Sequence, residues 1–246
     1  MISIISYFWV DKARARSYAI TPEHVRTWHN MIERNVTIPH RTICVTHVPE
    51  LIDFMETAPL DCTKHVSGTC GVKLMHWRKD IASLLGGRIC AMDVDCVVTG
   101  NLDEILSRDE DVLLWKNPNY EEGGRRGFYQ GSFQMLTAGA RPFLYDDFDP
   151  NATPSWLNRR FGGFEQCWIS ERLNTSFPEP GWEWSEKYLT EADGIYGAGR
   201  LFAGRQDKGL GSELPDNAKL VFTPGNREPS QPDVQAAHPW IKEHFH

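Results

Sequence analysis

The sequence has no pair of cysteines in Cys-x-x-Cys spacing, although it contains six cysteines in 246 residues. Two of them, Cys90 and Cys96, stand in apolar runs where a reduced thiol packs as a small hydrophobic side chain. Disulfide frameworks and zinc sites need paired cysteines, so neither is expected here. We therefore predict a reducing, cytosolic compartment.

An excess of positive charge is also missing. The chain has 26 Lys and Arg against 33 Asp and Glu, which gives a formal net charge of -7. Nucleic-acid binding through a broad surface needs a basic face that neutralises phosphates, so this balance argues against it. A local patch such as Arg159-Arg160 can still contact phosphate.

No hydrophobic run reaches the length of a membrane span. The apolar opening, Met1 to Val10, has no basic leader and no small-residue cleavage site, so we expect a first buried strand. Repeats and Pro/Gly-rich linkers are absent too. We expect one domain over 1–246, with a nucleotide-binding half at 1–110 and a sugar and acceptor half at 111–246.

What the first half does contain is an alternation of extended apolar runs with helical patterns. The strand-like runs are Ile2–Val10, Arg41–Thr46 and Arg88–Val94, and the helical patterns are Thr21–Arg34 and Val72–Leu85. Such alternation is typical of an α/β protein with parallel strands. The last of these helices is expected to end at Gly86-Gly87.

The second half has shorter runs, Val112–Trp115 and Tyr129–Leu136, joined by Gly-rich and acidic stretches. This pattern predicts a mixed sheet with long connections. The segment Ala198–Asn217 has four glycines and little periodicity, so we expect a long surface loop.

Two carboxylates stand where a buried strand stops. The run Arg88–Met92 is followed by Asp93-Val94-Asp95 and then by the turn formers Thr99-Gly100-Asn101. In open α/β sheets, ligands bind beyond the carboxyl ends of strands, and two acids at such an end are costly unless they hold a cation. The pair predicts a divalent metal site; the alternative is a solvated turn.

The run Met92–Ile105, MDVDCVVTGNLDEI, resembles the Asp-x-Asp segment of the retaining, metal-dependent glycosyltransferases of the GT-A fold, particularly the galactosyltransferase and glycogenin-like group. Stand-alone bacterial and phage proteins of this kind look similar. Weaker similarity extends to Trp77–Lys79, Gly131–Leu136, Glu165-Gln166 and Pro224–Asn226.

The resemblance implies a GT-A-like, Rossmann-type central mixed sheet flanked by helices. It also implies transfer of a hexose or pentose from a nucleotide-diphosphate sugar, by default a UDP-sugar, with retention of configuration. Asp93 and Asp95 would hold Mn²⁺ or Mg²⁺, and Arg78 would reach the donor. Lys73 and Lys79 are alternatives for that role.

Other donor-site residues are implied by the same resemblance. Tyr7 and Trp9 end the first strand, so each is expected either to stack on the base or to lie in the core. Gln130 and Ser132 are expected to face the bound sugar, with Gly131 between them allowing close approach of the backbone.

Glu165-Gln166 matches the Asp-Gln pair that these enzymes place beside the reacting sugar, with Glu in place of Asp. The carboxylate would bind sugar hydroxyls, and the amide of Gln166 would lie near the anomeric carbon. Two polar residues at a helix start are the alternative.

The third metal ligand of the family, a histidine near the C-terminus, has no direct counterpart, because Phe222 stands at its position. His238 is the nearest replacement, although a surface histidine is an equal alternative. Arg227 or Glu228 stands where the family has a lysine. We expect the tail from Pro224 onward to form a lid over the diphosphate.

Two other functions remain open. Asp93–Val98 also matches the motif of haloacid-dehalogenase-type phosphohydrolases, in which Asp93 would be the nucleophile and Asp146-Asp147 the later acidic pair. That motif normally closes the first strand, whereas two strand-like runs precede it here. Nine tryptophans also suit a non-catalytic carbohydrate-binding protein. The acceptor is not indicated: glycan, lipid-linked sugar, protein and modified nucleobase all fit.

Overall fold

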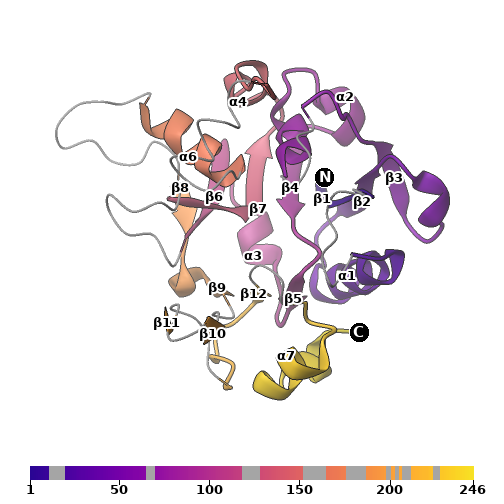
Figure 1. Cartoon of the computed structure of the whole chain (residues 1–246), viewed down its shortest axis with the longest axis vertical. Coiled ribbons are helices and arrows are strands. Elements are labelled where there is room, and N and C mark those ends of the chain that lie inside the picture. The colour runs from indigo at the N-terminus through magenta and orange to yellow at the C-terminus, as the bar shows by residue number, and fades with distance from the viewer. Residues whose placement is uncertain are drawn as a thin grey trace.

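The structure is a computed structural model of the whole chain. It describes residues 1–10, 20–64, 70–117, 128–151, 165–175, 187–197, 201–202, 205–206, 212–223 and 228–246. A seven-stranded sheet with the order β3-β2-β1-β4-β7-β6-β8 forms its centre (Figure 1). No described helix is long and apolar enough to cross a membrane.

The sheet is mixed, as predicted. Its parallel part is made of β1 (Ile2–Phe8), β2 (His40–Thr46), β3 (Glu56–Pro59) and β4 (Arg88–Met92). On the other side of β4 lie β7 (Tyr129–Thr137), β6 (Val112–Lys116) and β8 (Lys187–Leu189); β7 runs antiparallel to both β4 and β6. The sequence patterns found every one of the longer strands but missed β3 and β8, which have only four and three residues.

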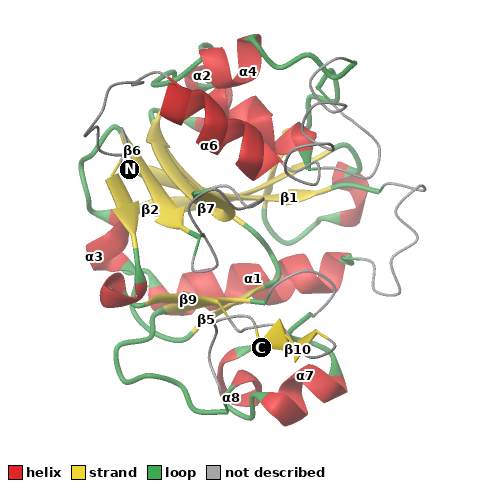
Figure 2. Ribbon diagram, turned by 60° about the vertical axis from the view of Figure 1, so that its left-hand side comes forward, coloured by secondary structure: helices red, strands yellow, loops and turns green. Residues whose placement is uncertain are grey.

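Helices cover both faces of this sheet. The α1 helix (Pro22–Asn35) lies on one face, and α2 (Ala82–Leu85), α4 (Phe143–Asp146) and α6 (Glu165–Thr175) lie on the other (Figure 2). Shorter elements are α3 (Asp103–Leu106), η1 (Pro49–Leu51), η2 (Gly71–Trp77) and η3 (Glu191–Asp193). The chain ends with α7 (Pro232–Ala237) and α8 (Ile241–His244).

The predicted single helix Val72–Leu85 is wrong. It is divided into the 3₁₀ helix η2 and the short α2, because Arg78 adopts an extended backbone with φ -59° and ψ 145°. The Arg78 guanidinium pairs there with Asp61 at 3.1 Å and with Asp80 at 2.6 Å, contacts that a continuous helix would not provide. The predicted stop at Gly86 is confirmed, since Gly86 has a φ of +86°.

A second, smaller sheet has the order β5-β12-β9, from β5 (Cys96–Val98), β12 (Leu220–Phe222) and β9 (Ile195–Gly197). The segment Ala198–Asn217, predicted as a loop, contains two paired short strands, β10 (Leu201–Phe202) and β11 (Arg205–Gln206). That expectation is therefore wrong for these four residues. Part of the segment lies outside the described residues.

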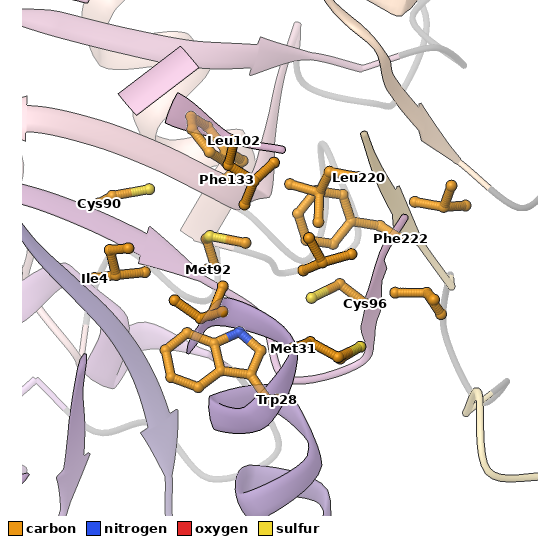
Figure 3. Packing of buried hydrophobic residues seen from close by; sticks show 14 of the residues in the cluster. Ile4, Trp28, Met31, Cys90, Met92, Cys96, Leu102, Phe133, Leu220 and Phe222 are labelled. Carbon is orange, nitrogen blue, oxygen red and sulfur yellow. The ribbon is translucent and has the colours of Figure 1, made fainter. Parts of the chain in front are cut away.

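Alternation of side chains along the strands produces two cores. Even-numbered residues of β1, such as Ile4, join Trp28 and Met31 of α1 in the first core, which also includes Cys96 of β5 (Figure 3). Odd-numbered residues, such as Ile5, join η2, α2, α4 and α6 in the second core. Burial on both faces explains why the parallel strands are continuous apolar runs.

The turn before β9 contains a glycine in the left-handed conformation, and a side chain at this position is poorly tolerated. Gly194 has a φ of +84°, and a Cβ there would lie 2.4 Å from the carbonyl oxygen of Asn217. We predict that Gly194→Ala lowers the free energy of unfolding by about 2 kcal/mol or more, from the conformational cost plus the clash. Chemical denaturation measures it.

Gly87→Ala is the matched control, because no atom of the described residues, its two chain neighbours aside, lies within 4 Å of the Cβ that it would add. This control should change stability by less than about 0.5 kcal/mol. Equal stability of the two variants would contradict the constraint at Gly194.

Candidate functional site

The two carboxylates of the Asp93-Val94-Asp95 segment come directly after β4, between the large and the small sheet. The backbone N–H of Asp93 donates to the carbonyl of Ser132 in β7 at 3.0 Å. The carbonyl of Asp95 accepts hydrogen bonds from the N–H and hydroxyl of Thr223, at 3.0 and 2.9 Å. Each aspartate is thus tied to a different sheet.

Lys73 of η2 supplies the positive charge of this site. Its ammonium donates to Oδ1 of Asp93 and lies 3.7 Å from Oε1 of Glu165, and the residue is only 7% exposed. Burial acts to lower the pKa of Lys73, but the charges of Asp93 and Glu165 raise it above its ordinary value. Lys73 is therefore a permanent cation between two carboxylates that are twenty and ninety-two positions away in the sequence.

Arg78 does not take that position. Its partners are Asp61 and Asp80, and its guanidinium also lies 5.8 Å from the ring centre of Tyr145. Lys79 is exposed. Of the three basic side chains that the sequence offered for the donor role, the structure brings Lys73 alone to Asp93 among the described residues.

Negative charge accumulates around Asp95. Burial raises the pKa of Asp95 well above its ordinary range, and the charges of Asp93 and Glu228 add to this effect. Glu228 is 2% exposed, and sequence reasoning gave it no part in the acidic group. The four residues before it in the sequence, Pro224-Gly225-Asn226-Arg227, carry no periodic pattern that would have indicated burial.

Glu165 and Gln166 begin α6 beside Gly131 of β7, as a pair. The N–H of Gly131 donates to Oε1 of Gln166 at 3.3 Å, and a Cβ on Gly131 would lie 2.8 Å from Oε1 of Glu165. Ser170, one turn later, accepts from the N–H of Tyr129 at 3.0 Å and so holds α6 on the same strand. The structure therefore brings the predicted pair to Lys73 and Asp93.

Gly131 belongs to a bulge in β7. In the pairing with β6, Leu114 stands opposite Gln134 and Trp115 opposite Gln130, so Gly131–Phe133 have no partner in β6. Bulges turn side chains and free backbone groups at functional sites. Ser132 is half-buried at this position, and Oε1 of Gln130 is buried without a hydrogen bond from any described residue.

The two aromatic residues of the first strand differ in environment. Tyr7 is 6% exposed, and its hydroxyl lies 2.9 Å from Nδ1 of His76, so its ring belongs to the second core and has little surface for a base. Burial raises the pKa of Tyr7. Trp9 is half-buried against the same core. Base stacking by Trp9 stays a prediction, whereas the packing of Tyr7 favours the core alternative.

The C-terminal segment is part of the first core, so the lid expectation is wrong for 228–246. Val234, Trp240 and Ile241 are buried with Trp28 on the α1 side of the sheet. His238 is 5% exposed beside Trp240, with 5.7 Å between ring centres. Arg227 lies outside the described residues.

Among the described residues, no three His, Cys, Asp or Glu side chains form a group that could hold a metal ion. The predicted set of Asp93, Asp95 and His238 is thus not assembled as a three-residue site, and the role of His238 stays a prediction. Two carboxylates are still a usual protein contribution to a Mg²⁺ or Mn²⁺ site when substrate phosphates and water complete the shell. The charge that surrounds Asp95 fits such a cation.

No protein-family profile and no curated protein sequence matches this chain. Among solved structures, the crystal structure of galactosyltransferase LgtC in complex with donor and acceptor sugar analogs is similar, with a TM-score of 0.55 and 8% sequence identity. The match covers 98% of this chain and 94% of that chain. The similarity confirms the fold: a GT-A-like mixed sheet flanked by helices.

A buried histidine beneath the site makes stability depend on pH. Burial, aided by the charge of Lys73, lowers the pKa of His76 from its ordinary value of 6.5 to about 4. Between pH 4 and pH 6.5, His76 therefore binds a proton in the unfolded chain but stays neutral in the folded chain. Stability should therefore fall as pH falls from 6.5 to 4, by up to about 3 kcal/mol from this residue.

Urea denaturation of the wild type and His76→Gln over this pH range measures the effect. The variant is expected to be less stable at neutral pH but to lose less stability per pH unit, with a difference of about 1.4 kcal/mol per unit. Parallel slopes for the two proteins would show that His76 is charged in the fold.

Proposed function

We propose that the protein transfers a sugar from a nucleoside diphosphate sugar to an acceptor. The observation that carries the proposal is the arrangement of Asp93, Lys73 and Glu165 at the carboxyl end of β4. This is the edge where ligands bind in open α/β sheets. The fold supports the same reaction class, because a galactosyltransferase shares it.

Cleavage of a sugar-phosphate bond leaves a diphosphate with additional negative charge. Asp93 and Asp95 would hold Mn²⁺ or Mg²⁺, which stabilises that leaving group electrostatically when bound. Lys73, paired with Asp93, is close enough to this edge to bind a phosphate oxygen as well. A UDP-sugar is the donor to test first.

The sugar would lie over the β7 bulge. Glu165 and Gln166 lie on one side of Gly131, while Gln130 and Ser132 are its neighbours in the bulge. Carboxylate and amide groups bind sugar hydroxyls, and the amide oxygen of Gln166 accepts from the N–H of Gly131 at this point. The acceptor can be a glycan, a lipid-linked sugar, a protein or a modified nucleobase.

The metal assignment predicts the behaviour of Asp95→Asn. A UDP-sugar together with Mn²⁺ should raise the melting temperature of the wild type, because a ligand that binds only the folded state stabilises it by mass action. In Asp95→Asn this shift should be lost and transfer should fall by roughly 100-fold or more. The shift of the melting temperature is measured by thermal unfolding of both proteins with the UDP-sugar alone, with Mn²⁺ alone and with both ligands.

Glu50→Gln is the control, since it removes one negative charge from an exposed position in η1. It should behave as the wild type does. Normal transfer by Asp95→Asn in excess Mn²⁺ would exclude the metal site at this position. A covalent aspartyl phosphate on Asp93 would instead support the phosphohydrolase alternative.

Retention of the anomeric configuration is a separate prediction. An inverting enzyme needs a carboxylate base on the acceptor side. Of the acids that could serve, Asp147 is paired with Arg172, Asp149 accepts from the N–H of Asn151 at 2.7 Å, and Glu165 is paired with Lys73. We expect the product to keep the anomeric configuration of the donor, as measured by product NMR.

The opposite anomer would contradict this prediction. In that case Glu165→Gln should abolish transfer while the donor still binds, because the base alone would be missing.

A further inference from the structure

A chain of buried polar side chains runs beneath the candidate site, from η2 to β7. His76 is fully buried, and Gln134 is 1% exposed. Nε2 of His76 lies 3.0 Å from Oε1 of Gln134, and Nε1 of Trp77 lies 2.9 Å from the same oxygen. On the other side, Nε2 of Gln134 donates to the carbonyl of Gly131 at 3.1 Å.

The donor and acceptor roles in this chain follow from Trp77. An indole N–H can only donate, so the Gln134 atom that faces it must be the oxygen. The same oxygen then accepts from His76, which fixes the proton on Nε2. Nδ1 of the neutral ring therefore accepts, and the hydroxyl of Tyr7 donates to it. Each group has one possible role.

The chain ends on the bulge. Gly131–Phe133 have no partner in β6, and Gln134 supplies the hydrogen bond that the carbonyl of Gly131 lacks from that strand. The N–H of the same residue holds Gln166, and its Cα lies against Glu165. A shift of Gly131 would thus move both side chains of the pair.

The other end of the chain is the helix that bears Lys73. His76 and Trp77 follow Lys73 on the single 3₁₀ helix η2, all of whose residues are buried. The hydroxyl of Tyr7 also lies 3.4 Å from the carbonyl of Lys73. The hydrogen-bonded chain therefore joins the two walls of the site: η2 with its cation and β7 with the Glu165-Gln166 pair.

We propose that His76 and Gln134 are positioning residues: their hydrogen bond fixes the distance between Lys73 and the Glu165-Gln166 pair. The inference deepens the proposed sugar transfer and rests on it. Neither side chain touches the substrate. They act through Gly131, and positioning matters because a displacement of about 1 Å at a reacting centre can reduce a rate by roughly 100-fold.

The test compares variants that lose the hydrogen bond between His76 and Gln134, which we call bridge-less variants, with one variant that keeps it. His76→Phe retains the ring shape, and Gln134→Met retains the length of the side chain, but neither can form the bond. His76→Gln carries an amide whose donor and acceptor can replace the two ring nitrogens. A folded bridge-less variant should lose roughly tenfold or more in kcat, while the donor KM changes by less than about threefold.

His76→Gln should recover kcat to within about threefold of the wild type. Leu106→Ala is the control for loss of stability alone, because Leu106 is buried in the first core. At a temperature where all variants are folded, its kcat should equal that of the wild type. Should either bridge-less variant fail to fold, the other carries the comparison.

Crystal structures of the wild type and one bridge-less variant give a readout that needs no activity. The separation of 3.7 Å between Nζ of Lys73 and Oε1 of Glu165 should increase in the variant. An unchanged separation, a normal kcat in both bridge-less variants, or a rise in KM alone would overturn the inference. Absence of donor binding and transfer in the wild type would instead refute the proposed function.

Discussion

The bulge at Gly131–Phe133 is the constraint on which the candidate site depends. Two backbone groups of Gly131 that pairing with β6 leaves available are used by two other parts of the fold. The carbonyl of Ser132 accepts from Asp93 in register with the β4 pairing, whereas the N–H of Gly131 donates to Gln166 and its carbonyl accepts from Gln134. Regular pairing with β6 would have consumed these two groups within the sheet, since buried backbone groups are almost always hydrogen bonded. The irregularity therefore orients the start of α6 and the buried polar chain relative to the strand that holds Asp93.

Charge balance explains why Lys73 is buried. A carboxylate such as Glu165, 5% exposed, is costly to bury unless a counter-charge accompanies it, and Lys73 supplies that charge. Among the described residues no cation is paired with Asp95, and burial, together with the neighbouring charges of Asp93 and Glu228, raises its pKa. The negative charge of the site is thus compensated by Lys73 on the side of η2, whereas it is left uncompensated around Asp95 on the side of β5. This asymmetry favours binding of a cation next to Asp95 rather than next to Glu165.

Sequence patterns predicted the regular elements well and the contacts poorly. Continuous apolar runs identified β1, β2, β4 and β6, because both faces of these strands are buried, and the mixed run Tyr129–Leu136 identified β7. The strand-end position of Asp93 followed from the same runs. Lys73 could not be preferred over Arg78, since the choice depends on where η2 breaks, and the break is stabilised by Asp61, which lies outside the local pattern. The bulge was equally hidden, because its three residues continue the apolar and polar alternation of β7.

The C-terminal part of the chain shows how the two carboxylates of the Asp93-Val94-Asp95 segment are separated. Asp93 is held by β7 of the large sheet, whereas Thr223, which follows β12 of the small sheet, holds the carbonyl of Asp95. The side chains of Phe222 and Trp115 stack across the two sheets, with 4.9 Å between ring centres. The distance between the carboxylates is therefore set by how the sheets pack, and that packing includes the buried tail with Trp240. A tail so placed acts on the site through the core, because α8 packs against β5, the strand that follows Asp95 and pairs with β12.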